Sequence, residues 1–226
     1  MQHSNERDPA IRAAAFDLDG TLLYTIPDIA ASLNHALSRF GMPTHSVEAC
    51  MRIVGGGIRQ AVIRAVPPGT GEEAVNQVLE VYLEFYFNHC TEKTDYYPGV
   101  PAMLAGLAER GIALGILSNK TEATVQKIVK RYFPDVPFRC VLGRVDGRPL
   151  KPAPEAAAPL LEALGVPAAE AAYVGDSGLD MKFARAAGML PVAAPWGYRA
   201  REELVEQGAV LIARDAGDLL EQLLRA

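Results

Sequence analysis

The stretch Ala15-Phe16-Asp17-Leu18-Asp19-Gly20-Thr21-Leu22 decides the fold expected for this chain. It continues an apolar run that begins at Ile11 and is too short to carry a helical stripe, which predicts a buried parallel strand. Two acids, Asp17 and Asp19, end this strand. A carboxylate at the end of a core strand is costly unless it is paired, hydrogen-bonded or bound to a cation.

Two interpretations of these acids are open at this point. Ligands bind at the carboxyl ends of parallel strands, so the pair predicts a site that requires a cation. Alternatively, Asp17 to Gly20 form a solvated turn after an edge strand. The choice depends on whether other strands bring suitable partners to the same edge of the sheet.

Strand and helix patterns alternate from residue 98 onward. Strands are expected at 112–117, 138–142, 171–174, 190–194 and 209–212. Helices are expected at 100–110, 121–132, 154–164, 179–187 and 215–224. This alternation predicts an α/β fold, namely a doubly wound parallel sheet of the Rossmann-like kind with right-handed crossovers.

The segment between the first strand and residue 98 is mostly helical in pattern. Apolar residues recur at helical spacing in 27–40 and 72–88, and shorter helices are expected at 46–51 and 58–66. We therefore predict a small all-helical cap domain at 25–96, inserted after strand 1 of an α/β core that consists of 1–24 and 97–226. Residues 1–9 are expected to be a loose tail. Three aromatic residues are expected in the core of the cap: Tyr82, Tyr86 and Phe87.

The composition excludes several classes of function. The 226 residues carry a formal net charge of −5, so the chain lacks the basic field that nucleic-acid binding needs. Cys50, Cys90 and Cys140 are far apart, which indicates neither a disulfide framework nor a zinc site. No apolar run is long enough for a membrane span, so we expect a cytoplasmic protein, either a monomer or a homodimer.

Polar side chains follow several predicted strands at the point where each strand ends. Ser118 and Asn119 follow the second strand, Lys151 follows the third, and Asp176 and Asp180 follow the fourth. Because these strand ends share one edge of a doubly wound sheet, we expect them beside the two acids of the first strand. Carboxylates gathered without His or Cys favour a hard cation, and we predict Mg²⁺. Each signal alone is more typical of a helix cap, a solvated lysine or an ordinary loop, and only their combined order and spacing favours a site.

This combination of groups suits phosphoryl transfer. A carboxylate can act as a nucleophile, so Asp17 would form an aspartyl phosphate. Asp19 would protonate the leaving oxygen and would then activate water. Lys151 and the Ser118 hydroxyl would hold the remaining phosphoryl oxygens. Phosphoryl transfer depends on positioning and on charge stabilisation, which these groups supply.

From about Ile11 to Leu224, the chain resembles the haloacid dehalogenase-superfamily phosphatases that carry a helical cap after the first strand. The residues that match the four family motifs are Asp17-Leu18-Asp19-Gly20-Thr21, then Ser118, then Lys151, and finally Gly175-Asp176-Ser177 with Asp180. The resemblance implies that Asp17 is the nucleophile and a Mg²⁺ ligand, and that Asp19 is the acid and base and binds the metal through its carbonyl. It also implies that Asp176 is a further metal ligand, and that Asp180 is a ligand or an acid directly behind the ligands. Since the dehalogenases of this superfamily have no acid at the position of Asp19, the resemblance favours hydrolysis of a phosphate ester.

Four segments are similar to the phosphoglycolate phosphatases of this superfamily: Pro27-Asp28, Val54 to Gly57, Tyr97 to Val100 and Trp196 to Arg199. The resemblance therefore implies a small anionic metabolite as substrate, with 2-phosphoglycolate as the leading choice. The candidate substrate-binding residues are Thr21, Asn119, Gly56, whose amide precedes a helix, and Arg59, whose planar fork suits a carboxylate. The chain departs from those enzymes at Tyr24 and Thr25, where an acid and Ser or Thr are common.

Other functions stay open on the sequence. A phosphatase or mutase of the same superfamily could act on a sugar phosphate, a nucleotide or pyrophosphate. A non-catalytic phospho-acceptor module also places acids and a lysine at strand ends, but it needs no cap and carries its phosphorylated Asp on a later strand. A non-catalytic binding protein would not need the full set of Asp17, Asp19, Ser118, Lys151 and Asp176.

Overall fold

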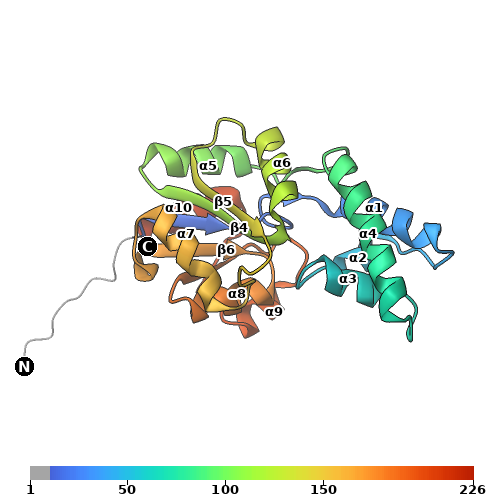
Figure 1. Cartoon of the computed structure of the whole chain (residues 1–226). Helices are drawn as coiled ribbons and strands as arrows, with labels where there is room; N and C mark the ends of the chain where they lie inside the picture. Colours follow the sequence, from blue (N-terminus) through green and yellow to red (C-terminus); the bar gives the residue numbers. More distant parts are fainter. Residues whose placement is uncertain (1–10) are drawn as a thin grey trace, which may run out of the picture.

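The computed structural model describes residues 11–226 and is built around a six-stranded parallel sheet (Figure 1). The strand order is β5-β4-β1-β6-β7-β8. The strands are β1 Ala13–Phe16, β4 Ala113–Thr121, β5 Phe138–Arg144, β6 Ala171–Gly175, β7 Leu190–Ala193 and β8 Leu211–Ile212. The chain winds outward in both directions from β1, which confirms the predicted doubly wound α/β fold. The tail predicted at 1–9 lies outside the described residues.

Helices cover both faces of this sheet, and the residues of β1 divide between the two sides. Ala13 and Ala15 share an apolar cluster with residues of α7 and α8, whereas Ala14 and Phe16 share another with residues of α5, α6 and α10. Successive strand residues point to opposite faces, so a strand that is covered on both sides is apolar throughout. The five helices are α5 Val100–Glu109, α6 Glu122–Tyr132, α7 Ala157–Leu164, α8 Gly178–Ala186 and α10 Ala216–Arg225.

A few elements differ from the sequence-based expectation. β4 continues to Thr121, beyond the expected end at 117, because Thr121 still pairs with Arg144 of β5. Four short elements among the described residues were not predicted: α9, Arg201–Glu206, a 3-10 turn at Ala168–Glu170, and an antiparallel ladder of β2, Leu23–Tyr24, with β3, Asp95–Tyr96. Strands of two residues are too short to show a hydrophobic period.

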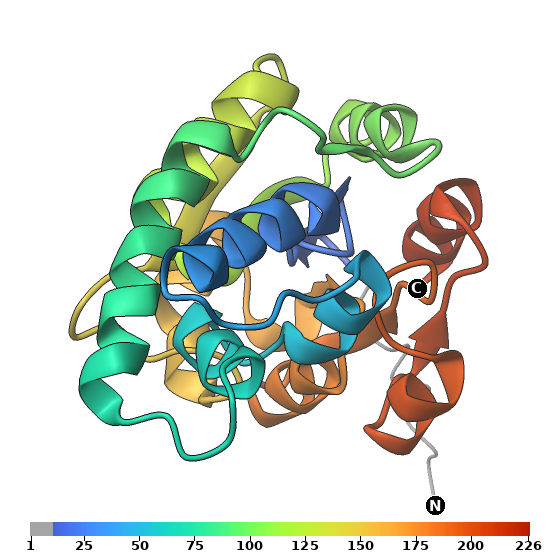
Figure 2. The ribbon, with the colours of Figure 1, turned by 90° about the vertical axis from the view of Figure 1, so that its right-hand side faces the viewer.

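Four helices between β2 and β3 lie together on one side of the sheet (Figures 1 and 2), and we call them the helical insert. They are α1 Ile26–Arg39, α2 Val47–Ile53, α3 Ile58–Ala65 and α4 Glu72–His89. Their buried apolar side chains belong to the same cluster as Phe16 of β1. The division into a core and a separate cap domain stays a prediction. Between residues 11 and 226, no helix has both the length and the apolar character needed to cross a bilayer.

Asp28, in the first turn of α1, ties the beginning of the helical insert to its end. Its carboxylate accepts hydrogen bonds from the backbone N–H of Lys93 at 2.9 and 3.0 Å. It also accepts from the backbone N–H of Thr94 at 2.9 Å and from the Thr94 hydroxyl at 2.8 Å. Since Asp28 and Thr94 are both buried, these bonds hold together the two segments that connect the insert to the sheet.

Replacing Asp28 with Ala is expected to lower the free energy of unfolding by about 3 kcal/mol, because the buried N–H of Thr94 and the N–H of Lys93 lose their acceptor. Urea unfolding of the two proteins measures this difference. Asp95→Asn is the matched control, since Asp95 is exposed and, among residues 11–226, accepts only from the N–H of Tyr96. Its effect should stay below about 0.5 kcal/mol. Equal losses in the two variants would contradict the role given to Asp28.

Candidate active site

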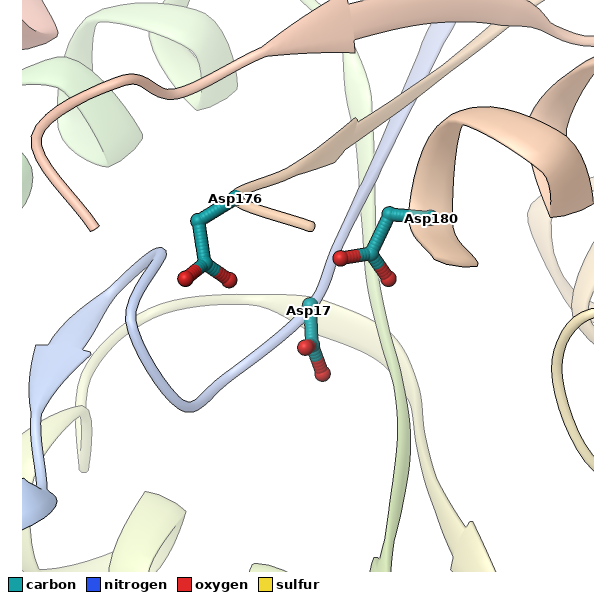
Figure 3. Close-up of side chains that lie close together, drawn as sticks. All are labelled: Asp17, Asp176 and Asp180. Carbon is teal, nitrogen blue, oxygen red and sulfur yellow. The ribbon is translucent and has the colours of Figure 1, made fainter. Parts of the chain in front are cut away.

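Three carboxylates that are far apart in sequence meet at the carboxyl edge of the sheet (Figure 3). Asp17 directly follows β1, Asp176 directly follows β6, and Asp180 lies in the first turn of α8. One oxygen of each carboxylate lies within 4.8 Å of the others. Asp176 and Asp180 are buried, with exposed fractions of 2% and 0%. The structure therefore brings together three of the four predicted metal-binding acids.

Asp180 is oriented by the beginning of α8. The Ser177 side chain caps this helix, and the Asp180 carboxylate accepts from the Ser177 N–H at 3.1 Å and from its hydroxyl at 2.5 Å. A Cβ on Gly175 would lie 2.3 Å from the Cβ of Asp180, so only glycine leaves room for this acid. The Gly-Asp-Ser loop is thus both a helix cap and the holder of two site carboxylates.

Lys151 is the buried cation among these acids. Its ammonium lies 2.7 Å from Asp180 and 3.1 Å from Asp17, and it donates to the Tyr173 hydroxyl at 2.8 Å. Asn119 fixes the backbone of Lys151, accepting from its N–H at 3.0 Å and donating to its carbonyl at 2.9 Å. Burial works to lower the pKa of Lys151, but Asp17 and Asp180 outweigh it and hold that pKa well above its ordinary value. Lys151 is therefore charged at neutral pH.

The carboxylates carry more negative charge than Lys151 offsets. Burial raises the pKa of Asp17 from 3.8 to about 6, and Lys151 opposes this rise only in part. Burial also raises the pKa of Asp176 well above its ordinary value, and the charges of Asp180 and Asp17 add to the rise. Ionised carboxylates that are buried beside one another are stable only when a further positive charge lies near them.

One oxygen of Asp17 supports the same conclusion. Within residues 11–226, Oδ1 is the buried side-chain atom that lacks a hydrogen-bond partner. Lys151 lies 3.1 Å from this oxygen without the alignment of a hydrogen bond, so the contact is an ion pair only. An unsatisfied buried carboxylate oxygen beside two other acids fits a bound divalent cation.

Asp19 lies apart from this cluster, toward the helical insert. Its Oδ1 accepts from the Thr25 hydroxyl at 2.5 Å and lies 2.8 Å from the ammonium of Lys120. Thr25 in turn lies 2.9 Å from the hydroxyl of Tyr198. Lys120 was not predicted as a site residue. Its position directly after the predicted pair Ser118-Asn119 is the signal in the sequence that could have identified it.

A cavity of about 110 Å³ lies between the strand ends and the helical insert. The predicted residues that line it are Asp17, Asp19, Gly56, Ser118, Asn119, Lys151, Asp176 and Asp180. The insert contributes Ile29, Ala61, Leu83 and the expected core residues Tyr82 and Tyr86 to its wall. Phe87 is 40% exposed, so its prediction as a core residue is wrong.

Two candidate substrate-binding residues do not line this cavity. Thr21 is buried behind the site, where its hydroxyl donates to Asp176 at 3.3 Å. Arg59 is turned to the outside of the insert, where it pairs with Glu72 at 3.0 Å and donates to Asn76 at 2.7 Å. Thr21 thus positions a carboxylate, and Arg59 stabilises the packing of α3 on α4.

The segment Trp196 to Arg199, which follows β7, also contacts the site. The backbone N–H of Tyr198 donates to Asp176 at 2.7 Å, and the Trp196 indole donates to the carbonyl of Thr21 at 3.0 Å. Arg199 reaches the insert, donating to the carbonyl of Met51 at 2.6 Å and to that of Val54. This segment therefore connects the carboxylate cluster to the end of α2.

Known proteins resemble the chain over nearly its whole length. The family model described as haloacid dehalogenase-like hydrolase matches residues 14–194. Phosphoglycolate phosphatase 1 of Pseudomonas aeruginosa is 32% identical over 215 residues, which cover 92% of this chain and 78% of that protein. The phosphoglycolate phosphatase of Neisseria gonorrhoeae is 35% identical over 192 residues, which cover 83% and 81%.

A solved structure agrees with these relatives. A candidate phosphoglycolate phosphatase from Lactobacillus delbrueckii subsp. bulgaricus superimposes with a TM-score of 0.90 at 33% identity, over 96% of this chain and 100% of that one. The superposition covers residues of both the sheet and the helical insert. The chain is therefore an enzyme of the haloacid dehalogenase-like hydrolase family.

Proposed function

We propose that this enzyme is a Mg²⁺-dependent phosphomonoesterase that works through an aspartyl phosphate on a small anionic metabolite, with 2-phosphoglycolate as the favoured substrate. The observation that carries the proposal is the arrangement around Asp17. Its carboxylate lies at the end of β1 with an unsatisfied oxygen, beside the buried charge of Lys151. A nucleophile that must approach a phosphate dianion needs such a cation next to it.

The reaction divides between the two acids that follow β1. A carboxylate oxygen of Asp17 attacks phosphorus, and the bond from phosphorus to the leaving oxygen breaks. Asp19 supplies the proton that the leaving oxygen needs, and later accepts a proton from the water that hydrolyses the acyl phosphate. Their different surroundings suit these roles, because Asp17 lies among the buried acids and Lys151 whereas Asp19 faces the insert.

Two groups near Asp17 would hold the phosphoryl oxygens. Ser118 is 3% exposed, lines the cavity and has a hydroxyl available as a donor. Lys151 supplies a positive charge that Asp180 and Tyr173 hold in place. Asn119 keeps the backbone at Lys151 in position.

Asp17, Asp176 and the carbonyl of Asp19 would hold the metal ion, with Asp180 beside them. Bound Mg²⁺ would neutralise charge on the phosphate and on the carboxylates. Asp180 already accepts from Ser177 and Lys151, so it suits the orientation of its neighbours better than direct ligation. Asp17 and Asp176 retain free lone pairs on their oxygens.

The substrate choice rests on the size of the cavity and on the relatives. A cavity of about 110 Å³ suits a small molecule. The curated relatives are named phosphoglycolate phosphatases. The amides at Gly55 to Gly57, which precede α3 and line the cavity, could contact an anionic leaving group.

Phosphate release from a panel of small phosphate monoesters tests this function. We expect the highest kcat/KM with 2-phosphoglycolate, loss of activity with EDTA and recovery on addition of Mg²⁺, because the acids require a cation. Sugar phosphates, nucleotides and pyrophosphate complete the panel. Activity that is indifferent to chelation would contradict the metal requirement, and no release from any ester would contradict the proposed function.

A further inference from the structure

The cavity is lined by three cations, and two of them are fully engaged by the protein. Lys151 contacts Asp17, Asp180 and Tyr173. The Arg199 guanidinium donates hydrogen bonds to backbone carbonyls of the insert and of Tyr198. Lys120, the residue before the end of β4, is the third. It has the fewest partners of the three, although only 9% of its side chain is exposed.

Lys120 and Tyr86 form a contact between β4 and the helical insert. Tyr86 is a buried residue of α4, and its hydroxyl accepts a hydrogen bond from the Lys120 ammonium. The ammonium also lies 4.4 Å from the centre of the Tyr86 ring. The side chains of the two residues therefore meet in the cavity wall, one from the sheet and one from the insert.

Lys120 and Tyr86 have hydrogen-bond donors that no acceptor among residues 11–226 uses. An ammonium carries three N–H donors. Lys120 makes one hydrogen bond, to Tyr86, and one ion pair, with Asp19 at 2.8 Å. Burial, and then the charge of Asp19, raises the pKa of Tyr86 well above its ordinary value, so the hydroxyl keeps its proton. In the described part of the chain no acceptor receives that proton, and buried donors of this kind are normally satisfied.

The position of the pair indicates what it contacts. Under the proposed function, on which this inference rests, Asp19 gives its proton to the leaving oxygen. Lys120 pairs with Asp19, so its charge lies on the side of the leaving group, whereas Lys151 pairs with Asp17, where the phosphoryl group would lie. An anionic group one carbon away from the leaving oxygen would reach the free donors of the pair.

We propose that Lys120 and Tyr86 form the subsite for a carboxylate on the leaving group, and that they select phosphate esters of 2-hydroxy acids. The ammonium and the phenol each donate to the carboxylate, a charge-assisted arrangement. The apolar wall of Ile29, Ala61 and Leu83 limits the length of the leaving group. Because Tyr86 belongs to the insert, the carboxylate also bridges the insert to the sheet.

The test compares two esters of the same length, 2-phosphoglycolate and ethyl phosphate, which lacks the carboxylate. The readout is the ratio of their kcat/KM values, because the ratio cancels effects on Asp19 that are common to both esters. Lys120→Met should lower this ratio roughly 10- to 100-fold, as expected for one hydrogen bond to a charged group. Tyr86→Phe should lower it about 3- to 10-fold, and Lys120→Arg should restore part of the loss.

Lys127→Met is the matched control. Lys127 also lies on an aromatic ring of α4, at 4.6 Å from the centre of Phe87, but it does not line the cavity. Its ratio should equal that of the wild type. Lys120→Gln and Tyr86→Phe keep the experiment decisive if Lys120→Met does not fold.

Several results would overturn the proposal. If the Lys120 and Tyr86 variants keep the wild-type ratio of the two kcat/KM values, these residues do not bind the carboxylate. The same conclusion follows if Arg59→Ala lowers this ratio and Lys120→Met does not. A wild type that hydrolyses both esters equally well would refute the carboxylate subsite and leave the phosphatase function intact. A wild type that hydrolyses neither ester but releases phosphate from others of the panel would refute the subsite alone, whereas no release from any ester would refute the phosphatase function as well.

Discussion

Asp17→Asn is expected to abolish phosphate release from 2-phosphoglycolate, with a loss in kcat of roughly 10⁴-fold or more, the scale seen when a nucleophile is removed. An amide cannot form the acyl phosphate, and Asp19 lies on the other side of the site beside Lys120 and Thr25. The change keeps the size of the side chain. Initial rates of phosphate release at saturating Mg²⁺ measure the effect.

The stability of the same variant separates a chemical defect from misfolding. The pKa of Asp17 is about 6 in the fold against an ordinary value of 3.8, so the folded protein resists its ionisation. In EDTA, Asp17→Asn should therefore be more stable than the wild type by about 3 kcal/mol above pH 6. The difference should shrink as the pH falls and vanish below pH 3.8, where Asp17 is protonated in the folded and unfolded states. An inactive variant that is less stable at pH 8 would point to misfolding.

Lys151→Met is expected to damage both stability and activity. Removing one partner of a buried ion pair costs about 3–5 kcal/mol, because the remaining charges stay buried without compensation. Here the remaining charges are Asp180, at 0% exposure, and Asp17. Loss of the cation near the phosphoryl group should also lower kcat roughly 10³-fold. Urea unfolding in EDTA and steady-state kinetics measure the two effects.

The stability loss of Lys151→Met should depend on pH in one direction. It should be largest at about pH 9, where Asp17 of the wild type is ionised and Lys151 is charged. The stability loss should decrease as the pH falls toward about 6, because protonated Asp17 carries no charge for the Lys151 ammonium to neutralise. Lys130→Met is the control, since Lys130 is exposed on α6 and lies outside the cavity. A loss that grows toward acid pH would contradict the assignment.

The sheet could be predicted because its signals are local. The apolar run before Asp17 and the alternation after residue 98 follow from the burial of both faces of a parallel sheet, and neither depends on distant contacts. The positions of Asp17 and Asp176 directly after their strands follow from the same alternation, since parallel strands end on one edge. Ser118 was expected after its strand but lies inside β4, three residues before its end. The boundary of β4 was missed because its last residues are held by pairing with β5.

The side chains on the insert side of the site could not be predicted from the sequence in the same way. Arg59 and Lys120 are both cations near a predicted ligand-binding segment, and only the packing of α3 on α4 turns Arg59 toward Glu72. Tyr86 has the spacing of a core residue, and it is buried, yet its hydroxyl contacts Lys120 in the wall of the cavity. Side-chain direction at a contact between two layers depends on tertiary packing, which the helical period does not encode.

Rapid acid quenching of the wild type during turnover of 2-phosphoglycolate, followed by peptide mass spectrometry, tests the central claim most directly. We expect a phosphorylated peptide that contains Asp17, formed and lost at rates consistent with kcat, and absent from Asp17→Asn. Turnover without any phosphorylated peptide, or phosphate found on a different residue, would contradict it.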